Sequence, residues 1–419
     1  MDKATARQEL LHKYMPVVRD YFTADKKAAS IEDLNKFMPQ SPYILYVHLP
    51  FCDNICRDCT YRRDSKLEDI EKYCDILIKE IELLGNSTAK ERGKATAIYF
   101  GGGTPSLIPI KTLTKIIEKL KHYFFNDYMP EMSLEINPSS YDRGNLDAYR
   151  DLGINRLSLG IQSFHDAPLK EMGRTYTADL ARTVVQETAD AGWNFNIDLI
   201  FGFDAQTPQM FYDDVDYAIN NGVSHIATYN LLRRMSHDKK EKLLSDQSDI
   251  YYHIRNVFKK AGFIQYFINE FARNKDSICE YTNGRLVLPR TENLCFGTAG
   301  EGGTKAGGIY KKYNGRKSYM ESIEKGVIPA FFIKTNDPHI PLTVLLMDMM
   351  RGMEKMDTNM FKQQFGVDPT EIEFIKDLEK YGFINIDDDT HTKTINMNEE
   401  YLFEYNAFYN DIKYFEFVD

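Results

Sequence analysis

The chain lacks both a long apolar run and an excess of basic residues. No stretch reaches the roughly 18 apolar residues of a membrane-spanning helix. The N-terminal sequence MDKATARQELL is polar and lacks the apolar core of a secretory signal. The 419 residues include 52 Lys and Arg against 62 Asp and Glu, a formal net charge of −10. Since binding nucleic-acid phosphates requires a clustered basic surface, we expect a cytoplasmic protein that binds neither membranes nor nucleic acids.

Cysteine is also scarce, with six residues in the chain, and the spacing does not suggest disulfides. Cys52, Cys56 and Cys59 lie together in CDNICRDC, directly after an apolar run. Zinc sites usually need four protein ligands, whereas three thiolates suit an iron–sulfur cluster whose fourth iron stays open. We therefore expect these cysteines to hold a [4Fe-4S] cluster in a reducing compartment. The other cysteines are expected to be structural: Cys74, Cys279 and Cys295.

Strand-like and helical segments alternate from residue 43 onward. The expected strands are 43–49, 96–100, 133–136, 156–161, 196–201 and 225–229. The expected helices are 67–84, 110–123, 145–152, 180–191 and 208–220. Alternation at this spacing predicts an α/β fold in which crossovers connect the strands of a parallel sheet.

The two flanks of this pattern read differently. Residues 1–42 predict a polar helical arm that ends near Pro39 and Pro42. Residues 236–335 look irregular, and their glycine-rich run FGTAGEGGTKAGG (296–308) is expected to be too flexible for a regular element. Residues 336–419 predict a small, mainly helical domain with a short hairpin around 383–397.

Short motifs stand at or near the ends of the expected strands. They are YVHLPFC (46–52), GGGTPS (101–106), LEINP (134–138), NRLSLGIQSF (155–164), GRTYT (173–177) and NIDLIFG (196–202). In this order and spacing they resemble the oxygen-independent coproporphyrinogen III dehydrogenase family of radical S-adenosylmethionine (SAM) enzymes. The resemblance implies a partial (β/α)6, TIM-like radical SAM barrel over 43–235, with its chemistry at the carboxyl ends of the strands. It further implies that 236–335 closes the active site and that 336–419 is winged-helix-like.

The resemblance also implies a set of cofactor contacts. In such enzymes the open iron chelates SAM, and an electron from a flavodoxin- or ferredoxin-type donor cleaves SAM to a 5′-deoxyadenosyl radical. The positions that correspond to contacts with this SAM are Tyr46, Gly102 and Glu135. Those that correspond to contacts with a second SAM are Gly103, Thr104, Gln162, Arg174 and Asp198.

The chain departs from the family pattern in three places. Asp58 stands before the third cysteine, where the family has an aromatic residue, and the sequence continues as CTYRR rather than with a C-x-N segment. The haem chaperones of the family carry an HNxxYW-like motif, but the chain has EYTNGRLV (280–287) there, and its one tryptophan is Trp193. The N-terminal substrate contacts of the coproporphyrinogen decarboxylases are not recognisable. The last two departures favour the methyltransferase-like members, which include enzymes that methylate and open haem anaerobically, whereas Asp58 removes an aromatic wall of the second-SAM site.

We therefore expect an enzyme that uses a second SAM to methylate or remodel a tetrapyrrole or a similar unsaturated substrate under anaerobic conditions. The loop FGTAGEGG (296–303) resembles the GAGG-type loop of the haem-utilisation members. Two basic pairs, 62–63 and 233–234, are candidates for binding propionates, although each is equally consistent with a solvated surface pair. Two alternatives remain open: a coproporphyrinogen III decarboxylase, and a haem chaperone that binds haem without turnover.

Overall fold

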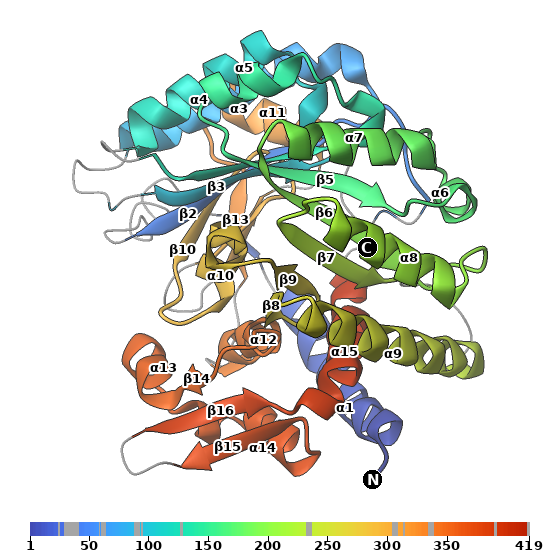
Figure 1. Ribbon diagram of the computed structural model, residues 1–419. Coiled ribbons are helices and arrows are strands. Elements are labelled where there is room, and N and C mark those ends of the chain that lie inside the picture. The colour runs from blue at the N-terminus through green and yellow to red at the C-terminus, as the bar shows by residue number, and fades with distance from the viewer. Residues whose placement is uncertain are drawn as a thin grey trace.

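The computed structural model describes residues 1–23, 26–28, 42–57, 59, 64–87, 93, 95–125, 129–231, 237–303, 309–312, 315–333, 339–388 and 392–416. A 13-stranded sheet runs through the molecule (Figure 1). Its spatial order is β1 (Lys26–Ala28), β13 (Ala330–Ile333), β12 (Ile309–Lys312), β11 (Glu301–Gly303), β10 (Glu292–Phe296), β2 (Tyr43–Leu49), β3 (Ala95–Gly102), β4 (Glu131–Ile136), β5 (Arg156–Gln162), β6 (Asn194–Phe201), β7 (His225–Asn230), β9 (Glu270–Ala272) and β8 (Ile264–Phe267). Neighbouring strands from β10 to β7 are parallel, and the strands beyond both ends pair antiparallel.

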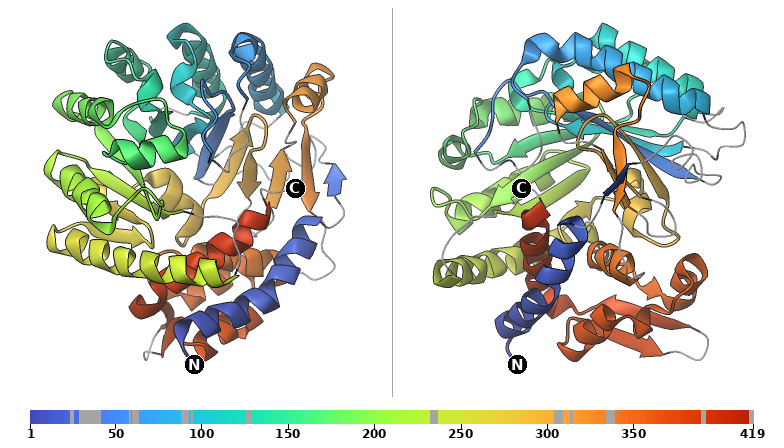
Figure 2. Two further views of the ribbon diagram at one scale, coloured as in Figure 1. Left: turned by 90° about the vertical axis from the view of Figure 1, so that its right-hand side faces the viewer. Right: turned by 180° about the vertical axis from the view of Figure 1, so that it is seen from behind.

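The parallel sheet that the sequence predicts is confirmed, with β2 at the predicted bounds and the other strands longer by one to three residues. Helices line the outer face of the curved sheet (Figure 2). They are α3 (Ile70–Ser87), α4 (Ile110–Phe124), α5 (Asn145–Asp151), α6 (Asp166–Met172), α7 (Ala178–Asp190), α8 (Pro208–Asn220) and α9 (His237–Lys260). In β2, Leu45 and Val47 pack into the main core, whereas Ile44 packs on the opposite face against Cys279 and Tyr281. The inner face of the sheet therefore remains available for polar and aromatic groups.

The prediction that residues 236–335 are irregular is wrong. This segment contains α9, β8, β9, α10 (Glu280–Leu286), β10, β11, β12, α11 (Arg316–Glu324) and β13. β10 adds a further parallel strand beside β2, with Glu292 opposite Tyr43 and Phe296 opposite Val47. A five-residue strand followed by glycines carries too weak a pattern to be recognised. The glycine-rich loop nevertheless includes the strand β11, because strand pairing fixes backbone that glycine alone would leave free.

The C-terminal domain combines short helices with a three-stranded sheet of order β14 (Met356–Asp357), β16 (Lys393–Met397) and β15 (Ile384–Asp388). The hairpin β15–β16 confirms the one that the sequence predicts around 383–397. The helices are α12 (His339–Met349), α13 (Thr358–Phe365), α14 (Glu373–Lys380) and α15 (Leu402–Glu416), of which α15 was not predicted. In the part of the chain that the structure describes, no helix is both long and apolar enough to cross a membrane.

The N-terminal helix α1 (Lys3–Thr23) confirms one helix of the predicted arm, but it packs on the C-terminal domain against α15 and α12. The region around Pro39 lies outside the described residues. Arg7 of α1 is 1% exposed and donates a 2.8 Å hydrogen bond to Glu404 of α15. It also forms an ion pair with Glu241 of α9. A buried charge needs such partners, so Arg7 links the first and last helices to the barrel.

Replacing Arg7 with Met should lower the free energy of unfolding by about 3 kcal/mol, because it leaves the Glu404 carboxylate poorly compensated. Urea unfolding followed by circular dichroism measures the change. Lys317→Ala is the matched control, since it removes an exposed ion pair with Glu321 and should leave the unfolding midpoint unchanged. Equal midpoints for Arg7→Met and the wild type would show that α1 is not held in this way.

Candidate active site

The cysteine loop begins where β2 ends. Cys52 and Cys56 are buried and Cys59 is partly exposed. The loop closes on itself, because the Cys52 N–H donates to the Asp64 carbonyl at 2.9 Å. Its far side is tied to the end of α6. There, the Arg57 N–H donates to the Met172 carbonyl at 3.0 Å.

The glycine motif approaches this loop through its backbone. The Gly103 N–H donates to the Leu49 carbonyl at 2.8 Å, and the Thr104 N–H donates to the Phe51 carbonyl at 2.7 Å. A Cβ on Gly103 would lie 2.5 Å from the Phe51 oxygen, so only glycine fits here. The Thr104 hydroxyl lies 3.7 Å from the Cys52 sulfur. The end of β3 is thereby fixed directly beside the first cysteine.

Glu135, near the end of β4, reaches this glycine motif. Its Oε2 accepts a 3.1 Å hydrogen bond from the Gly102 N–H. Gly102 has a φ of 116°, and a Cβ there would lie 2.6 Å from the His48 ring. Burial, with a further contribution from the Asp198 charge, raises the pKa of Glu135 to about 7. A buried carboxyl of this kind favours a cationic partner.

Arg174 lies near two of the cysteines and near Asp198. The Arg174 guanidinium interacts electrostatically with the Cys56 and Cys59 thiols and with the Asp198 carboxylate. Among the described residues, its Nε is buried without a hydrogen-bond partner. Burial raises the pKa of Asp198 to about 6, although Asn196 donates a 2.8 Å hydrogen bond to it. These residues therefore bring a guanidinium and a carboxyl group close to the cysteine loop.

Gln162 is held in an unusual backbone conformation at the end of β5. Its φ is 65°, and the pairing of β5 with β6 shifts register between Leu159 and Gln162. Such a conformation in a non-glycine residue is strained and is typical of functional sites. After it, Ser163 Oγ and the Phe164 N–H both donate to the buried Asp214 carboxylate, at 2.7 and 2.8 Å.

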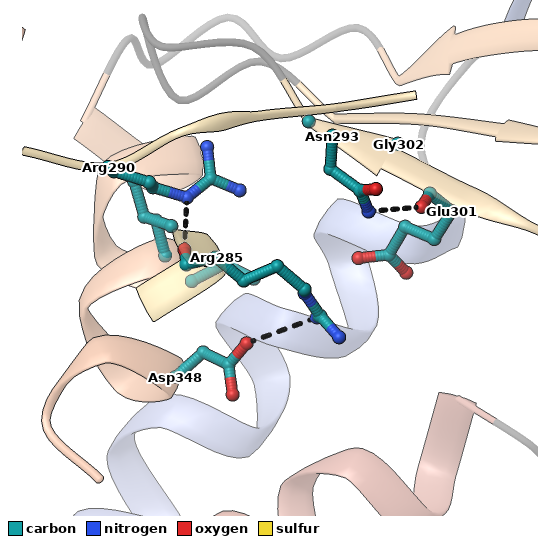
Figure 3. A pocket seen from close by; sticks show the side chains of 9 residues that line it. Arg285, Arg290, Asn293, Glu301, Gly302 and Asp348 are labelled. Atoms are coloured by element: carbon teal, nitrogen blue, oxygen red, sulfur yellow. Dashed lines mark hydrogen bonds and ion pairs between the residues drawn. The ribbon is translucent and has the colours of Figure 1, made fainter. Parts of the chain in front are cut away.

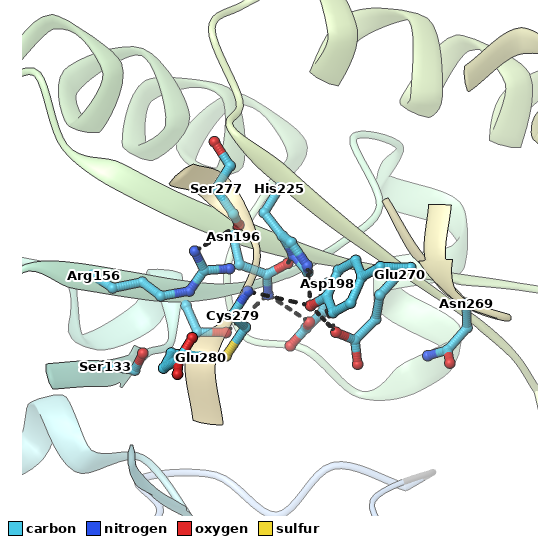
Figure 4. A network of polar contacts seen from close by, with 12 residues as sticks. Ser133, Arg156, Asn196, Asp198, His225, Asn269, Glu270, Ser277, Cys279 and Glu280 are labelled. Atoms are coloured by element: carbon cyan, nitrogen blue, oxygen red, sulfur yellow. Dashed lines mark hydrogen bonds and ion pairs between the residues drawn. The ribbon is translucent and has the colours of Figure 1, made fainter. Parts of the chain in front are cut away.

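A polar network inside the barrel supports Asp198 and was not predicted from the sequence (Figure 4). Asn196 accepts a 2.6 Å hydrogen bond from His225 Nδ1, and the other His225 ring nitrogen lies 2.8 Å from the Tyr266 hydroxyl. Tyr266 donates in turn to Glu270. Burial lowers the pKa of His225 to about 4, so this imidazole is neutral. Asn196 opens the motif NIDLIFG, which is the one sequence signal that points to the network.

Tyr46 faces the barrel interior with its hydroxyl 3.2 Å from His48 Nδ1. Its ring stacks on Tyr99 at a centroid distance of 6.3 Å, and the Tyr281 ring of α10 lies 6.1 Å away. These rings form an aromatic wall that continues from the expected SAM position towards α10.

The loop after β10 is held next to the same strand end. The Gly297 N–H donates to Glu80 of α3 at 2.8 Å, and Tyr319 of α11 donates to the same carboxylate at 2.7 Å. Tyr73 donates to the His48 carbonyl at 2.9 Å and accepts from the Thr298 N–H at 3.0 Å. The start of FGTAGEGG is therefore fixed beside the strand that leads into the cysteines.

A donor set of three thiols suits a [4Fe-4S] cluster. Within the described ranges, no group of three or more His, Cys, Asp or Glu side chains converges on one metal position. A [4Fe-4S] cluster places each thiolate on a different iron, so its ligands need not meet at one point. Of the other predicted positions, Asp58 and the basic pairs at 62–63 and 233–234 lie outside the described residues or side chains.

Several known proteins are similar to this chain in sequence. Residues 46–218 match the family model described as Radical SAM superfamily. The heme chaperone HemW of Lactococcus lactis is 29% identical over 245 residues, which cover 56% of this chain and 63% of the chaperone, less than two thirds of its length. The oxygen-independent coproporphyrinogen III oxidase of Cereibacter sphaeroides is 27% identical over 337 residues, covering 75% of this chain and 73% of that protein.

A solved structure shares the fold over nearly the whole chain. The coproporphyrinogen III oxidase HemN from Escherichia coli, described as a radical SAM enzyme, aligns with a TM-score of 0.73 and 19% identity. The alignment covers 91% of this chain and 93% of that one. The similarity therefore extends beyond the parallel strands into the C-terminal region.

Replacing Cys52, Cys56 or Cys59 with Ala should in each case abolish most of the bound iron after anaerobic reconstitution, because each thiolate would hold a separate iron. Iron analysis and EPR measure the loss. Cys74→Ala is the control: Cys74 of α3 is fully buried in the core, so the variant should keep a normal cluster content. Normal iron in any of the other variants would remove that cysteine from the ligand set.

Affinity for SAM should fall as the pH is lowered through about 7, because Glu135 is then protonated and no longer attracts a cation. Glu135→Gln should weaken SAM binding at pH 8 by about 10-fold, remove this pH dependence and leave the iron content unchanged. Equilibrium binding of SAM to reconstituted protein between pH 6 and 8 provides the test. The same pH dependence in both proteins would assign it to another group.

Proposed function

We propose, from the match of residues 46–218 to the radical SAM superfamily model, that the chain cleaves SAM at a [4Fe-4S] cluster. It would use a second SAM to methylate or remodel a tetrapyrrole under anaerobic conditions. Cys52, Cys56 and Cys59 would hold the cluster. When bound, the cluster supplies the electron that splits SAM into methionine and the 5′-deoxyadenosyl radical. A flavodoxin- or ferredoxin-type protein would deliver that electron.

The residues around the cysteines would bind and orient the first SAM. The glycines at 101–103 leave room for its methionine end beside the cysteine loop. Glu135 would accept hydrogen bonds from its ammonium group or its ribose, and the positive charge of SAM would favour ionisation of this carboxyl. Tyr46 would cover one side of the site with its ring.

The position of Arg174 is the observation that supports a second SAM. Its guanidinium lies in the field of Cys56, Cys59 and Asp198, with a buried Nε that lacks a partner among the described residues. A guanidinium binds a carboxylate through paired hydrogen bonds, so Arg174 suits the methionine carboxylate of SAM. Asp198 would accept a donor from the same molecule, with Gly103, Thr104 and Gln162 lining the remaining sides.

The aromatic wall supports a flat, unsaturated substrate. Tyr99 and Tyr281 lie 5.1 Å apart beside Tyr46 and present ring faces and edges to the barrel interior. Aromatic rings bind planar apolar molecules through stacking and edge contacts. The names of the relatives, a heme chaperone and a coproporphyrinogen oxidase, point to a tetrapyrrole.

Oxidative decarboxylation of coproporphyrinogen III is the second candidate. The specific support is the oxidase from Cereibacter sphaeroides, which matches this chain over 75% of its length, against 56% for the chaperone from Lactococcus lactis. A haem carrier without turnover is less well supported, because the segment EYTNGRLV in α10 has neither the histidine nor the Tyr-Trp pair of the haem motif.

Methyl-labelled SAM distinguishes the two reactions. We expect label in the tetrapyrrole product, together with 5′-deoxyadenosine and S-adenosylhomocysteine, in anaerobic assays read by mass spectrometry. Arg174→Gln should reduce methyl transfer at least 10-fold and retain 5′-deoxyadenosine formation, because the cluster-bound SAM keeps its own contacts. Unlabelled product with release of carbon dioxide would instead support the decarboxylase.

A further inference from the structure

The small cavity between the barrel and the C-terminal domain has balanced charges (Figure 3). Its volume is about 20 Å³, and its charged lining residues are Arg285, Arg290, Glu301 and Asp348. Two guanidiniums and two carboxylates therefore surround the same space, and Arg285 lies 3.6 Å from Asp348. Such a lining favours no ligand of either charge. The feature that bears on the reaction lies instead at the end of β5.

A rare backbone turn is centred on Gln162, the last residue of β5. The Ser163 N–H donates to the Ile161 carbonyl at 2.8 Å, and the φ of Gln162 is 65°. A hydrogen bond that closes a three-residue turn defines a γ-turn, and the form with a positive φ is rare and strained. Glycine would adopt it without strain, so a glutamine at this position needs neighbouring groups that hold the turn in place.

Asp214 of α8 holds the residues that follow the turn. Its side chain is fully buried and accepts hydrogen bonds from Ser163 Oγ at 2.7 Å and from the Phe164 N–H at 2.8 Å. Ser163 Oγ in turn accepts from the His165 N–H at 3.1 Å. Burial raises the pKa of Asp214 to about 7, while the two hydrogen bonds favour its ionised form. One carboxylate therefore organises three consecutive residues.

Two further side chains hold the same segment. Arg182 of α7 donates to the Phe164 carbonyl at 2.6 Å, so both ends of this residue's backbone are bonded. Tyr176 donates to the carbonyls of Gly160 and Ile161 at 2.8 and 2.9 Å. The turn is therefore held both before and after its central residue.

The turn directs the Gln162 side chain over the barrel interior. A Cβ on Gly160 would lie 3.1 Å from Gln162 Nε2, so the amide lies over the face of β5 that Gly160 shares with Ser158. Ser158 accepts a 2.9 Å hydrogen bond from Asn196, which also bonds Asp198. The strained turn thus brings the Gln162 amide to the same face as the polar groups around Asp198.

We propose that Asp214 is a positioning residue, which holds the γ-turn at Gln162 and thereby directs the Gln162 amide to the second SAM. The inference rests on the proposed function, in which Gln162 lines the second SAM site. An amide can both donate to and accept from the polar groups of SAM. Without the Asp214 contacts the backbone would relax to an unstrained φ, and the side chain would swing away from Gly160 and the barrel interior.

Equilibrium dialysis of radiolabelled SAM against the reconstituted protein tests this role. The wild type should bind two SAM molecules per cluster. Asp214→Ala should weaken binding of the second by about 10-fold, as expected when a hydrogen bond to a charged ligand is lost, and leave binding of the first unchanged. Asp213→Ala is the matched control, because Asp213 is the preceding residue of α8 but is exposed and accepts only from Gln209 of the same helix. It should bind both molecules as the wild type does.

A double variant separates positioning from a merely structural role. Because Asp214 acts through the Gln162 amide, Asp214→Ala should have little further effect on SAM binding in a Gln162→Ala background. The same 10-fold loss in both backgrounds would overturn the proposal. Should Asp214→Ala fail to fold, Ser163→Ala removes one of the two hydrogen bonds and should weaken the second SAM about 3-fold. Normal binding of the second SAM in a folded variant of this pair would likewise reject the proposal.

Urea unfolding tests the turn itself, independently of SAM. In the wild-type background, loss of Asp214 is partly offset by release of the strain at Gln162, whereas a Gln162→Gly background has no such strain to release. Asp214→Ala should therefore lower the unfolding midpoint more in the glycine background. Equal falls would show that Asp214 does not hold the turn. If the falls differ as expected but the wild type binds a single SAM, the second-SAM function is rejected, and with it the role of Asp214 in orienting that molecule.

Discussion

The candidate active site depends on the backbone contact between the glycine motif and the cysteine loop. Gly103 and Thr104 donate main-chain hydrogen bonds to the carbonyls of Leu49 and Phe51, so the end of β3 and the start of the cysteine loop form one rigid unit. This contact requires the absence of a side chain at Gly103. It also follows from topology, because β2 and β3 are parallel neighbours whose carboxyl ends meet at the same edge. The positions of Glu135, which reaches Gly102, and of Cys52, beside Thr104, both follow from it.

The barrel interior contains two buried carboxyl groups, Glu135 and Asp198, whose ionised forms are disfavoured by burial. Burial raises the pKa of both Glu135 and Asp198, and the charge of Asp198 contributes to the shift at Glu135. Neighbouring carboxyls of this kind are poorly stabilised without a cation. SAM carries a sulfonium and an ammonium group, so its binding would offset part of this cost. The neutral His225 and Asn196 orient Asp198 without adding a competing positive charge.

The sequence predicted the parts of the structure that have a strong local pattern. The run 43–49 and the strands after it alternate with amphipathic helices, and they form the predicted parallel sheet. The strand β10 was missed because its five residues precede a glycine-rich run, and only pairing with β2 stabilises it. The helix α15 was missed because its aromatic residues are buried by packing on α1 and α9, and these contacts form only in the folded chain.

The residues of the candidate site were likewise predictable only where they belong to a local sequence motif. Motif residues such as Glu135 and Asp198 could be identified from the order and spacing of the motifs. The hydrogen-bond network through His225, Tyr266 and Glu270 could not, because its residues come from three different strands and share no local sequence pattern.

The central claim is that three thiolates hold a cluster whose fourth iron is open for SAM. ⁵⁷Fe Mössbauer spectroscopy of the anaerobically reconstituted wild-type protein tests it most directly. The account predicts that adding SAM shifts the signal of one iron in four, since Cys52, Cys56 and Cys59 leave one site without a protein thiolate. A spectrum that SAM does not change, with all irons equivalent, would contradict it.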